Sequence, residues 1–480
     1  MKQPLWQKLY RDDNVYPSLH QNLKTDVLII GGGMTGLSTA YHLMKNNYRV
    51  VVVEANEIGS SASGRNTGKV TAQHGLIYHD LIKKHGLDFA NKYYEYQRDA
   101  IDDIEMIIKK YAFSCYFERT STIIQSACKE CINKEYEAYQ KLSIPSSLEK
   151  QENYASLMML HQAKFQPYAF IRQFAAMLRH HGVELYENSI YKMYHKEDQE
   201  YCIDVNDFQI HAKYIVFATQ FPIVDQHHFY YTRMIPIQKA IYTSHCYDQY
   251  LPFVLVDEPG YSINTYRDYL LLVLQYNQAR EMFEEKHFPV QAKMYMDKYD
   301  FKEHWTSSDY MSLDKLPYIG LLDHKDSNVY FASGYSQWGN TLGFMAGKII
   351  SQLIDGKHID MFDPHRKTDI LTMNFIKENL KTVSLLLKSH FQQVSHELPD
   401  IGEGKLMDIQ GHTFGVYRED EKVFHVVDVK CPHLGCLCRF HQEEKTWDCP
   451  CHGSRFDYTG HIIKGPSRYG LAYIKIEENS

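Results

Sequence analysis

The sequence lacks several features that mark common classes of protein. Its longest apolar runs, such as residues 270–274, are far shorter than the roughly 20 residues that a helix needs to cross a bilayer. The N-terminal residues contain no apolar core of a signal peptide, so we expect a cytoplasmic protein. With a net charge of −7, the chain has no basic footprint for nucleic acid. Repeats and low-complexity tracts are also absent.

Cysteine, in contrast, is concentrated in one place. Five of the ten cysteines lie within residues 431–451. Two short motifs occur there, Cys431-Pro-His433-Leu-Gly-Cys436 and Cys449-Pro-Cys451-His452-Gly-Ser454. Each motif offers one cysteine and one histidine as a pair of metal ligands, together with one further cysteine.

This pattern is typical of a Rieske [2Fe–2S] cluster, in which two thiolates bind one iron and two imidazoles bind the other. We expect Cys431 and Cys449 to bind the first iron, and His433 and His452 the second. Such a centre is neutral when oxidised, so its potential lies at about −150 to +300 mV, against about −400 mV for plant-type ferredoxins. A structural zinc site is the alternative for close Cys/His pairs. Zinc, however, does not require the glycines, the paired extra cysteines and the serine of these motifs.

The surroundings of the motifs refine this prediction. In many Rieske proteins a disulfide ties the two loops together, and this resemblance implies a bond between Cys436 and Cys451. Ser454 is a candidate hydrogen-bond donor to a cluster sulfide, a contact that raises the potential. Respiratory Rieske proteins carry a tyrosine where this chain has Phe456, so we expect a potential below the top of the range. Cys438 is expected to be a small buried side chain.

The other end of the chain predicts a dinucleotide site. Residues 26–40 read as a buried parallel strand, a tight turn and a helix. Gly31, Gly33 and Gly36 have the spacing of the glycine fingerprint, in which they serve the turn, the approach to a pyrophosphate and the helix–strand packing. A glycine-rich turn without a nucleotide is the structural alternative.

Two further features belong to this site. The pyrophosphate is expected at the helix N-terminus, on the free N–H groups near Met34 and Thr35. A second apolar strand ends in Glu54, 23 residues after Gly31, where a ribose-binding carboxylate belongs.

Four later segments indicate the kind of dinucleotide. They are the small, glycine-rich loop 59–71, the apolar strand 214–219, the Asp…Pro…Ile-Gly element 309–320 and the glycine loop in 330–341. Together these segments resemble the flavin-contacting elements of the D-amino-acid oxidase and glycine oxidase superfamily, over roughly residues 5–360. A departure is Gln220, where that superfamily usually has glycine. With its C-terminal motifs, the whole chain resembles the bacterial flavin oxidoreductases that are fused to a Rieske domain.

The resemblance implies FAD as the cofactor, beside the [2Fe–2S] cluster. The residues that it adds to the fingerprint as FAD contacts are Ser61, Ser63, Gly64, Arg65, Asn66, Thr67, Gly68, Ile190, Ala218, Thr219, Gly334, Gly339, Asn340 and Thr341.

The expected fold has three parts. An α/β, Rossmann-like FAD-binding domain with a parallel sheet takes residues 1–80, 150–222 and 307–362. A mixed antiparallel-sheet substrate or cap region takes residues 81–149, expected to be helical, and residues 223–306. Residues 363–400 form a connecting helix and linker, and 401–480 form a small all-β Rieske domain. The helix is predicted over 371–391, with its apolar residues packed between domains, or alternatively on a membrane surface.

Flavin exchanges two electrons with an organic substrate, whereas a Rieske cluster takes one electron at a time. The combination predicts a dehydrogenase that oxidises a small organic substrate, by resemblance an amine or amino acid. Electrons would pass from FAD to the cluster and on to an external protein or quinone. The alternative is a redox carrier or sensor that relays electrons from NADH or a partner protein without an organic substrate. A third hypothesis, a Rieske oxygenase, needs a mononuclear iron on His358, Asp360 and His365.

No motif identifies the catalytic residues. Arg65 and Lys69 are candidates to lie near the flavin ring, where a cation stabilises the reduced anion, or else to contact pyrophosphate or a structural carboxylate. His74 and Tyr335 are candidates for the cavity wall.

The substrate region departs from its relatives. Asn264 stands where relatives often have an arginine for a substrate carboxylate, with Arg267 as the nearest replacement, and this weakens the case for an ordinary amino-acid substrate. Cys128 and Cys131 have CxxC spacing but no second pair nearby, and we interpret them as incidental cysteines on a helix surface.

Overall fold

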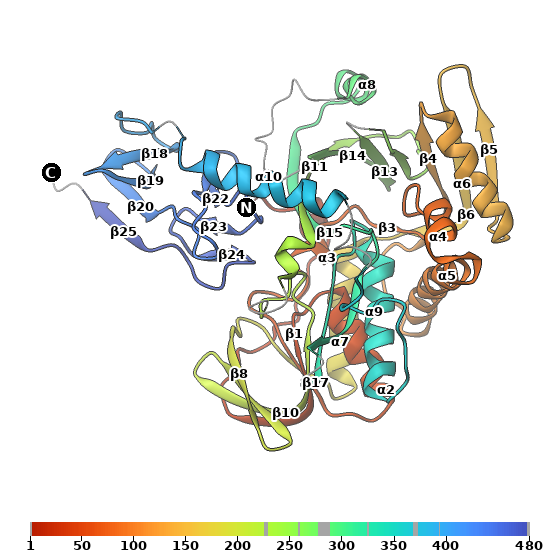
Figure 1. The fold of residues 1–480 in the computed structure, drawn as a ribbon, viewed down its shortest axis with the longest axis horizontal. Helices are drawn as coiled ribbons and strands as arrows, with labels where there is room; N and C mark the ends of the chain where they lie inside the picture. Colours follow the sequence, from red (N-terminus) through yellow and green to blue (C-terminus); the bar gives the residue numbers. More distant parts are fainter. Residues whose placement is uncertain are drawn as a thin grey trace.

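The computed structural model describes residues 2–224, 229–257, 260–276, 289–323, 326–367, 373–392 and 394–477. Within these ranges the strands form four sheets, two in the N-terminal three quarters of the chain and two smaller ones near the C-terminus (Figure 1). None of the described helices combines the length and apolarity needed to cross a membrane.

The first sheet has eight strands and is parallel in its centre. The strand order is β16-β17-β10-β1-β2-β7, with β8 and β9 added beside β10. Its strands are β1 (Leu23–Ile30), β2 (Val50–Val53), β7 (Glu184–Tyr186), β8 (Tyr191–Glu197), β9 (Glu200–Val205), β10 (Phe208–Phe217), β16 (Tyr318–Asp323) and β17 (Asp326–Ser333). Every residue of β2 is buried, as the run of four valines predicts for a parallel strand covered on both faces.

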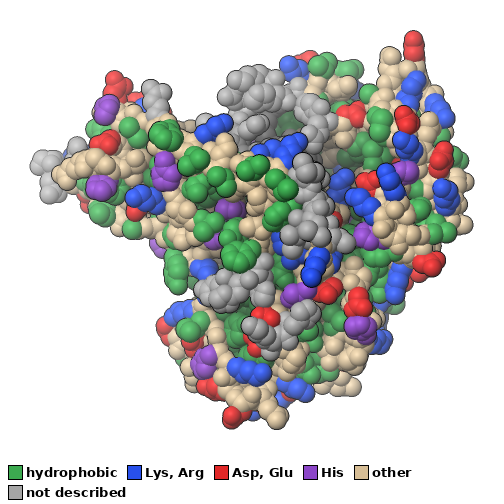
Figure 2. Space-filling model, in the orientation of Figure 1, with side chains coloured by type: hydrophobic (Ala, Val, Ile, Leu, Met, Phe, Trp, Pro, Cys, Tyr) green, Lys and Arg blue, Asp and Glu red, His purple; other side chains and the backbone are tan. Residues whose placement is uncertain are grey.

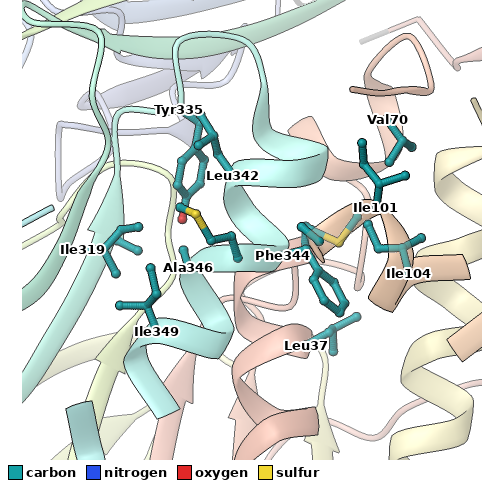
Figure 3. Packing of buried hydrophobic residues seen from close by; sticks show 14 of the residues in the cluster. Leu37, Val70, Ile101, Ile104, Ile319, Tyr335, Leu342, Phe344, Ala346 and Ile349 are labelled. Carbon is teal, nitrogen blue, oxygen red and sulfur yellow. The ribbon is translucent and has the colours of Figure 1, made fainter. Parts of the chain in front are cut away.

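Helices cover this sheet. They are α2 (Met34–Lys45), α7 (Pro167–His180), α9 (Gly339–Ile354) and the long α5 (Leu87–Lys110). Leu37 of α2, Ile101 and Ile104 of α5 and Phe344 of α9 all belong to one buried core, and Figure 3 shows how they lie around α9. Close packing of α2 on α9 depends on Gly347, because a Cβ there would lie 2.4 Å from the backbone nitrogen of Thr39. This core fixes the start of α2, where the nucleotide is expected.

The second sheet has nine strands, in the order β15-β11-β14-β13-β12-β4-β6-β3, with β5 beside β6. Its strands are β3 (Lys69–Val70), β4 (Glu118–Ser126), β5 (Ser146–Lys150), β6 (Ala155–Lys164), β11 (Met234–His245), β12 (Phe253–Leu255), β13 (Tyr261–Tyr266), β14 (Tyr269–Tyr276) and β15 (Glu303–Ser312). The neighbouring helices are α1 (Leu5–Leu9), α3 (Ala62–Arg65), α4 (Tyr78–His85), α6 (Lys129–Lys141) and α8 (Val290–Lys298), and the short 3-10 helix η1 (Tyr230–Thr232) precedes β11.

Two parts of this sheet differ from the sequence interpretation. Residues 155–164, which we grouped with the FAD-binding domain, form β6 of the second sheet. The region 81–149 is not wholly helical, because β4 and β5 lie within it and pair with β6. The final residues of β4 alternate between buried and partly buried, which is the pattern of a half-buried strand.

The C-terminal domain is all-β, as predicted. One sheet has the order β18-β19-β20-β25 and the other β21-β22-β23-β24. Their strands are β18 (Gly404–Ile409), β19 (His412–Arg418), β20 (Val423–Asp428), β21 (Arg439–His441), β22 (Thr446–Asp448), β23 (Arg455–Asp457), β24 (Ile462–Lys464) and β25 (Tyr473–Glu477).

The predicted connecting helix is present as α10 (Met373–Ser389), but the apolar stripe that we expected to be buried faces solvent. Its side chains, Ile376, Leu380, Val383 and Leu387, are 52–64% exposed, and Figure 2 shows hydrophobic side chains gathered over α10. Leu371, also part of that prediction, lies outside the described residues.

The opposite face of α10 makes the contacts between domains. Asn379 donates a hydrogen bond to the carbonyl oxygen of Thr232, at 3.0 Å. Leu385 and Leu386 pack against the core of the C-terminal domain. The position of the helix between the domains was therefore predicted, whereas its buried face was assigned wrongly.

Candidate flavin cavity and iron–sulfur site

The glycine fingerprint forms a tight turn between β1 and α2. Gly31 has a φ of +114°, and a Cβ there would lie 2.5 Å from the carbonyl oxygen of Ala218. A Cβ at Gly36 would lie 1.9 Å from the carbonyl oxygen of Gly31. Both positions therefore require glycine, and the turn brings the free N–H groups of the α2 N-terminus to the end of the sheet.

Glu54 lies directly beside this turn. Its carboxylate accepts hydrogen bonds from the backbone N–H groups of Gly32 at 2.8 Å and Asn56 at 3.0 Å. Burial raises the pKa of Glu54 above its ordinary value, against the lowering effect of these bonds. Strand β2 thus brings a carboxylate to the place where the fingerprint predicts a ribose contact.

The loop 59–68 folds over the start of α2. The hydroxyl of Ser63 accepts a hydrogen bond from the N–H of Met34 at 2.9 Å. The amides of Asn66 and Asn340 are 3.0 Å apart, and Asn340 also donates to the carbonyl oxygen of Lys69 at 2.7 Å. These contacts join the glycine-rich loop, β3 and the N-terminus of α9 around one space.

That space is a cavity of about 820 Å³, toward the upper end of the roughly 300–1,000 Å³ typical of cofactor and ligand pockets. Nine of the predicted FAD contacts line it: Gly33, Met34, Thr35, Ser63, Asn66, Thr67, Ala218, Gly339 and Asn340. The other predicted contacts do not form its wall: Gly31, Gly36, Glu54, Ser61, Gly64, Arg65, Gly68, Ile190, Thr219, Gly334 and Thr341. Ile190 is exposed, and its N–H donates to Asn206 at 2.8 Å.

Sequence reasoning missed part of the wall. The wall residues that were not predicted as individual contacts include Ala62, Gln220 and Ser308, and also Asp309, Ser336, Gln337 and Trp338, which lie in the segments 309–320 and 330–341 that resemble flavin-contacting elements. Asp309 accepts a hydrogen bond from the N–H of Gln337 at 2.6 Å and one from the amide of Gln220 at 3.3 Å. Burial raises the pKa of Asp309. The sequence feature that could have revealed this cluster is Gln220, which stands where the resemblance predicts glycine.

The part of the cavity beyond the fingerprint is lined mainly by apolar side chains, together with the charged Lys69, Lys239 and Asp257. Strands β11 to β14 supply its wall, with Ile237, Ile241, Val254, Leu255, Tyr261, Val273 and Leu274. Asn264 does not line it and donates to the carbonyl oxygen of Thr67 at 2.8 Å. Arg267 lies in the exposed turn after β13, against the rings of Tyr116 and Tyr266. The proposed replacement for a substrate-binding arginine is therefore not in the cavity.

Three of the four catalytic candidates line the cavity, namely Lys69, His74 and Tyr335. His74 stacks on Trp338 with ring centroids 5.1 Å apart. Its Nε2 lies 2.8 Å from the carbonyl oxygen of Thr71 and its Nδ1 2.7 Å from the hydroxyl of Tyr93. The carbonyl needs a donor, so Nε2 carries the proton and Nδ1 accepts from the phenol. Burial lowers the pKa of His74 to about 3, so this imidazole is a wall residue and not a free base.

Tyr335 and Arg65 have different surroundings. The hydroxyl of Tyr335 lies 2.7 Å from that of Thr35, and burial raises the pKa of the phenol. Arg65 points away from the cavity and donates to the carbonyl oxygens of Thr306 at 3.1 Å and Lys2 at 3.0 Å. Burial lowers the pKa of Arg65 to about 10. Arg65 therefore links the N-terminus to β15 and does not contact the cavity.

The two cysteine–histidine motifs form matching loops. In the first, the N–H of Gly435 donates to the carbonyl oxygen of Cys431 at 2.9 Å; in the second, Gly453 donates to Cys449 at 3.0 Å. Both glycines have positive φ, +76° and +80°. A disulfide joins Cys436 to Cys451 and so ties the loops together.

The four predicted cluster ligands lie side by side as two pairs. The thiols of Cys431 and Cys449 lie close enough for each to affect the pKa of the other. The imidazoles of His433 and His452 have centroids 4.9 Å apart at an interplanar angle of 88°. Within the described part of the chain, Nδ1 of His433 is buried and has no hydrogen-bond partner. A lone pair left in this way beside two thiols fits a [2Fe–2S] cluster with mixed ligands.

The neighbours of the thiols bear on the cluster as well. The hydroxyl of Ser454 lowers the pKa of the Cys431 thiol and accepts a hydrogen bond from the N–H of Ser467 at 2.9 Å. Cys438 is fully buried, and its thiol lies next to those of Cys431 and Cys449. The ring of Phe456 belongs to the same buried cluster of side chains.

The histidine side of this site rests on the second sheet. The ring of Tyr231 packs edge-on against His433 and His452, with centroids 5.0 and 5.2 Å away. A Cβ at Gly453 would lie 2.8 Å from Cβ of Pro236 in β11. The hydroxyl of Tyr310 in β15 donates to the carbonyl oxygen of Gly465 at 2.9 Å.

Other predicted groups lie elsewhere. His358 and Asp360 form an exposed pair at 2.9 Å after α9, and His365 pairs with Asp363 at 3.2 Å. The described residues that come together as metal-ligand groups do not include the three proposed for a mononuclear iron. Cys128 and Cys131, which we interpreted as incidental cysteines on a helix surface, are instead joined by a disulfide at the start of α6.

The chain matches two known families. Residues 26–353 match the FAD dependent oxidoreductases, and residues 391–475 match the Rieske [2Fe-2S] domain. The chain is 28% identical to the putative Rieske 2Fe-2S iron-sulfur protein YhfW of Bacillus subtilis (strain 168), over 96% of both chains. It is 24% identical to gamma-glutamylputrescine oxidoreductase of Escherichia coli (strain K12), over 72% of this chain and 88% of that one.

Solved structures agree on the fold. L-proline dehydrogenase from P. horikoshii superposes with a TM-score of 0.60 at 17% identity, covering 72% of this chain and 98% of that one. Glycine oxidase from Geobacillus kaustophilus gives 0.57 at 14% identity, covering 73% of this chain and all of that one. Together with the cavity at the fingerprint and the paired thiols and imidazoles, these matches show that the protein is an oxidoreductase of the FAD dependent oxidoreductase family with a C-terminal Rieske domain, and that its cofactors are FAD and a [2Fe–2S] cluster.

Proposed function

We propose that the protein is a dehydrogenase that oxidises a small amine or amino acid and delivers the electrons through the Rieske cluster to an external acceptor. When bound, FAD supplies two-electron chemistry toward the substrate and the cluster supplies one-electron chemistry toward the acceptor. The proposed cluster ligands are Cys431 and Cys449 on one iron, and His433 and His452 on the other.

The observation that carries the proposal concerns the strand pair β11–β15. Ile237 pairs with Asp309, and both line the cavity. The next pair along, Pro236 with Tyr310, contacts the cluster loops instead. Successive residues of a strand point to opposite faces. One two-stranded layer therefore lies between the cavity and the histidine side of the Rieske domain, an arrangement that supports electron transfer within the chain.

The residues of the cavity support oxidation of a neutral substrate. The apolar side chains that β11 to β14 contribute to the cavity favour the uncharged form of an amine substrate. His74 has both ring nitrogens engaged, so no proton transfer is assigned to it. Thr35 and Tyr335 hold each other at 2.7 Å and keep the wall rigid beside the α2 N-terminus.

The first cluster loop gives an acceptor a route to the cluster. His433 is only partly buried, and the neighbouring Leu434 is 48% exposed. An acceptor that docks beside Leu434 would approach His433, which is partly exposed although it also packs against Tyr231, whereas His452 is buried.

The test is an anaerobic titration of the purified holoprotein with a panel of amines and amino acids, and separately with NADH. Flavin absorbance reports the first transfer, and the electron paramagnetic resonance signal of the reduced cluster reports the second. The proposal expects at least one amine or amino acid to bleach the flavin and then produce the cluster signal. Reduction by NADH alone would favour a redox carrier. A bleached flavin beside a cluster that stays oxidised would rule out the internal transfer.

A further inference from the structure

The disulfide between Cys128 and Cys131 lies at the surface, at the start of helix α6. Cys128 is exposed and Cys131 is partly exposed. The disulfide between the cluster loops is buried by contrast, with Cys436 1% and Cys451 2% exposed. Within the described residues, the cysteines that are not in disulfides are buried as well. The Cys128–Cys131 pair is therefore the sulfur site that a reagent in solution can reach.

This disulfide contributes little to holding the fold. It joins residues three positions apart, whereas Cys436 and Cys451 are 15 positions apart, and a shorter loop restricts the unfolded chain less. The first turn of α6 is also closed without the sulfur atoms, because the N–H of Ile132 donates to the carbonyl oxygen of Cys128 at 3.2 Å. An exposed disulfide with a small structural role is of the kind that takes part in thiol exchange.

The start of α6 favours a thiolate on Cys128 once the disulfide opens. Cys128 is the N-cap residue of this 13-residue helix, and its sulfur accepts a hydrogen bond from the N–H of Cys131 at 3.3 Å. The free N–H groups of the first turn carry partial positive charge and stabilise a thiolate beside them. The acidic side chain in the same turn, Glu130, is paired with Lys134 at 2.6 Å. Cys128 is therefore suited to leave as a thiolate.

Hydrogen bonds connect the pair to the cavity wall. The N–H of Cys128 donates to the hydroxyl oxygen of Ser126 at 2.9 Å, and this hydroxyl donates in turn to the carboxylate of Asp257. The N–H of Ala127 donates to the same carboxylate at 2.8 Å. Asp257 and the three residues before it, 254–256, line the cavity. The three residues that lead into the disulfide thus hold one edge of the wall.

The backbone makes the same connection. Strand β4 ends at Ser126, two residues before Cys128, and leads into α6 (Figure 1). It runs parallel to β12, with Ile124 opposite Val254. The N–H of Val256 donates to the carbonyl oxygen of residue 125 at 3.0 Å. A change in the chain at residues 127–131 therefore acts on β12 through β4.

We propose that Cys128 and Cys131 form a redox-active site that accepts two electrons from a dithiol, and that reduction of this pair loosens the cavity wall at residues 254–257. This site stands apart from the proposed oxidation of an amine or amino acid, because its electrons come from the dithiol. Once the disulfide is open, residues 127–131 gain freedom and hold Asp257 less firmly.

The exchange has two steps. One thiolate of the dithiol attacks the exposed sulfur of Cys128, the bond between the two cysteines breaks, and Cys131 leaves as a thiolate that takes up a proton. The second thiolate of the dithiol then attacks the sulfur that is bound to Cys128, and Cys128 leaves as a thiolate. The dithiol is thereby oxidised to a disulfide, and the protein disulfide is reduced to two thiols.

The first test measures which disulfide reacts. The FAD-loaded, cluster-loaded protein is incubated with dithiothreitol without oxygen and quenched with iodoacetamide at intervals, and mass spectrometry of its peptides reports the state of each cysteine. We expect Cys128–Cys131 to open at least about tenfold faster than Cys436–Cys451, because exchange requires access to a sulfur. Equal rates for the two disulfides, or a Cys128–Cys131 pair that stays closed, would overturn the redox-active site.

Single-cysteine variants identify the reacting sulfur. Iodoacetamide should alkylate Cys128 in Cys131→Ser at least about tenfold faster than it alkylates Cys131 in Cys128→Ser, because Cys128 is more exposed and accepts the helix N–H. Cys202→Ser changes a buried cysteine and is the matched control, in which the pair should open at the unaltered rate. Faster alkylation of Cys131 would overturn the assignment of Cys128 as the attacked sulfur.

Hydrogen exchange tests the effect on the cavity wall. After reduction, amides of residues 253–257 should exchange roughly two- to twelvefold faster, as for the loss of one hydrogen bond, while residues 184–186 of the first sheet should not change. The absorbance of the flavin and of the cluster shows that both cofactors stay bound and oxidised. Ser126→Ala removes the hydroxyl link and should shrink the difference between the two redox states, and Asp257→Asn takes its place if that variant loses FAD. Equal exchange of residues 253–257 in the oxidised and reduced protein would overturn the connection to the wall.

Discussion

The hydroxyl of Tyr310 lies 2.9 Å from the carbonyl oxygen of Gly465, so a strand that borders the flavin cavity is bonded directly to the Rieske domain. Ser308 and Asp309 of the same strand line the cavity. On its other side, Lys464 donates to Ser308 at 2.7 Å and lies over the ring of Tyr310. Strand β15 therefore contacts both the cavity and the Rieske domain. A substitution on either face of this strand should affect both sites.

Replacing Tyr310 with phenylalanine should loosen the attachment of the Rieske domain. The variant keeps the ring and loses the hydroxyl contact, which is worth about 0.5–1.5 kcal/mol and corresponds to a roughly two- to twelvefold change in an opening equilibrium. Hydrogen exchange within residues 449–467 should become faster by that factor. Tyr469→Phe is the control, because Tyr469 is exposed and should leave exchange unchanged. Equal exchange in both variants would show that the Tyr310 hydroxyl does not hold the domains together.

Alanine at Gly453 should slow electron transfer from flavin to cluster. Position 453 has a φ of +80°, and the new Cβ would lie 2.8 Å from Cβ of Pro236, so the second cluster loop must move away from β11. Gly435→Ala is a matched control, since Gly435 has a φ of +76° in the equivalent loop and its Cβ would meet nothing within 4 Å. Both variants carry a similar backbone strain of about 1 kcal/mol.

The measurement is stopped-flow reduction under anaerobic conditions, with iron content and the cluster resonance signal confirming assembly. We expect cluster reduction to be slower in Gly453→Ala than in Gly435→Ala. Equal rates in the two assembled variants would mean that contact with Pro236 does not set the transfer.

Tyrosine at Phe456 should raise the potential of the cluster. Phe456 is fully buried in the core that contains Cys431 and Cys449. A hydroxyl that donates to a ligand sulfur stabilises the reduced, more negative cluster, by about 1 kcal/mol or roughly 40–50 mV. A redox titration monitored by the cluster signal measures the shift. Phe440→Tyr adds a hydroxyl to the same core against Gly404 and should leave the potential nearly unchanged; an unaltered potential in Phe456→Tyr would contradict the proposed contact.

The predicted and the missed parts of the site differ in how far apart their residues lie along the chain. The cysteine and histidine pairs sit in two short loops with the same local hydrogen bonds, and each loop can be read from a few consecutive residues. The same holds for Gly31 to Gly36 with the two strands around them. The cavity wall instead joins β3, β11, β12 and α9, and no local pattern connects Lys69 with Lys239 or Gln220 with Asp309.

Helix α10 shows a different limit of prediction from sequence. Periodicity finds an apolar stripe and hence a helix, but it does not decide which face is buried. The buried face is set by Asn379, which bonds to Thr232, and by Ser389, which bonds to the N–H of Leu437 at 3.2 Å. Polar contacts between domains therefore orient the helix, and its apolar stripe remains at the surface.

Replacing His42 with leucine should make the protein less sensitive to acid. His42 lies between α2 and α9, edge-on to Phe344, and within the described residues its Nε2 is buried without a hydrogen-bond partner. Burial, with the charges of Lys348 and Lys45, lowers its pKa from 6.5 to about 3. Between these values the unfolded chain binds the additional proton, so stability is lost as the pH falls below about 6.5. At pH 5 the loss relative to pH 7 should be about 2 kcal/mol. Melting temperatures at pH 7 and 5 test this: the advantage of His42→Leu over the unaltered protein should grow toward pH 5. A constant difference at both pH values would mean that His42 takes up its proton in the folded protein.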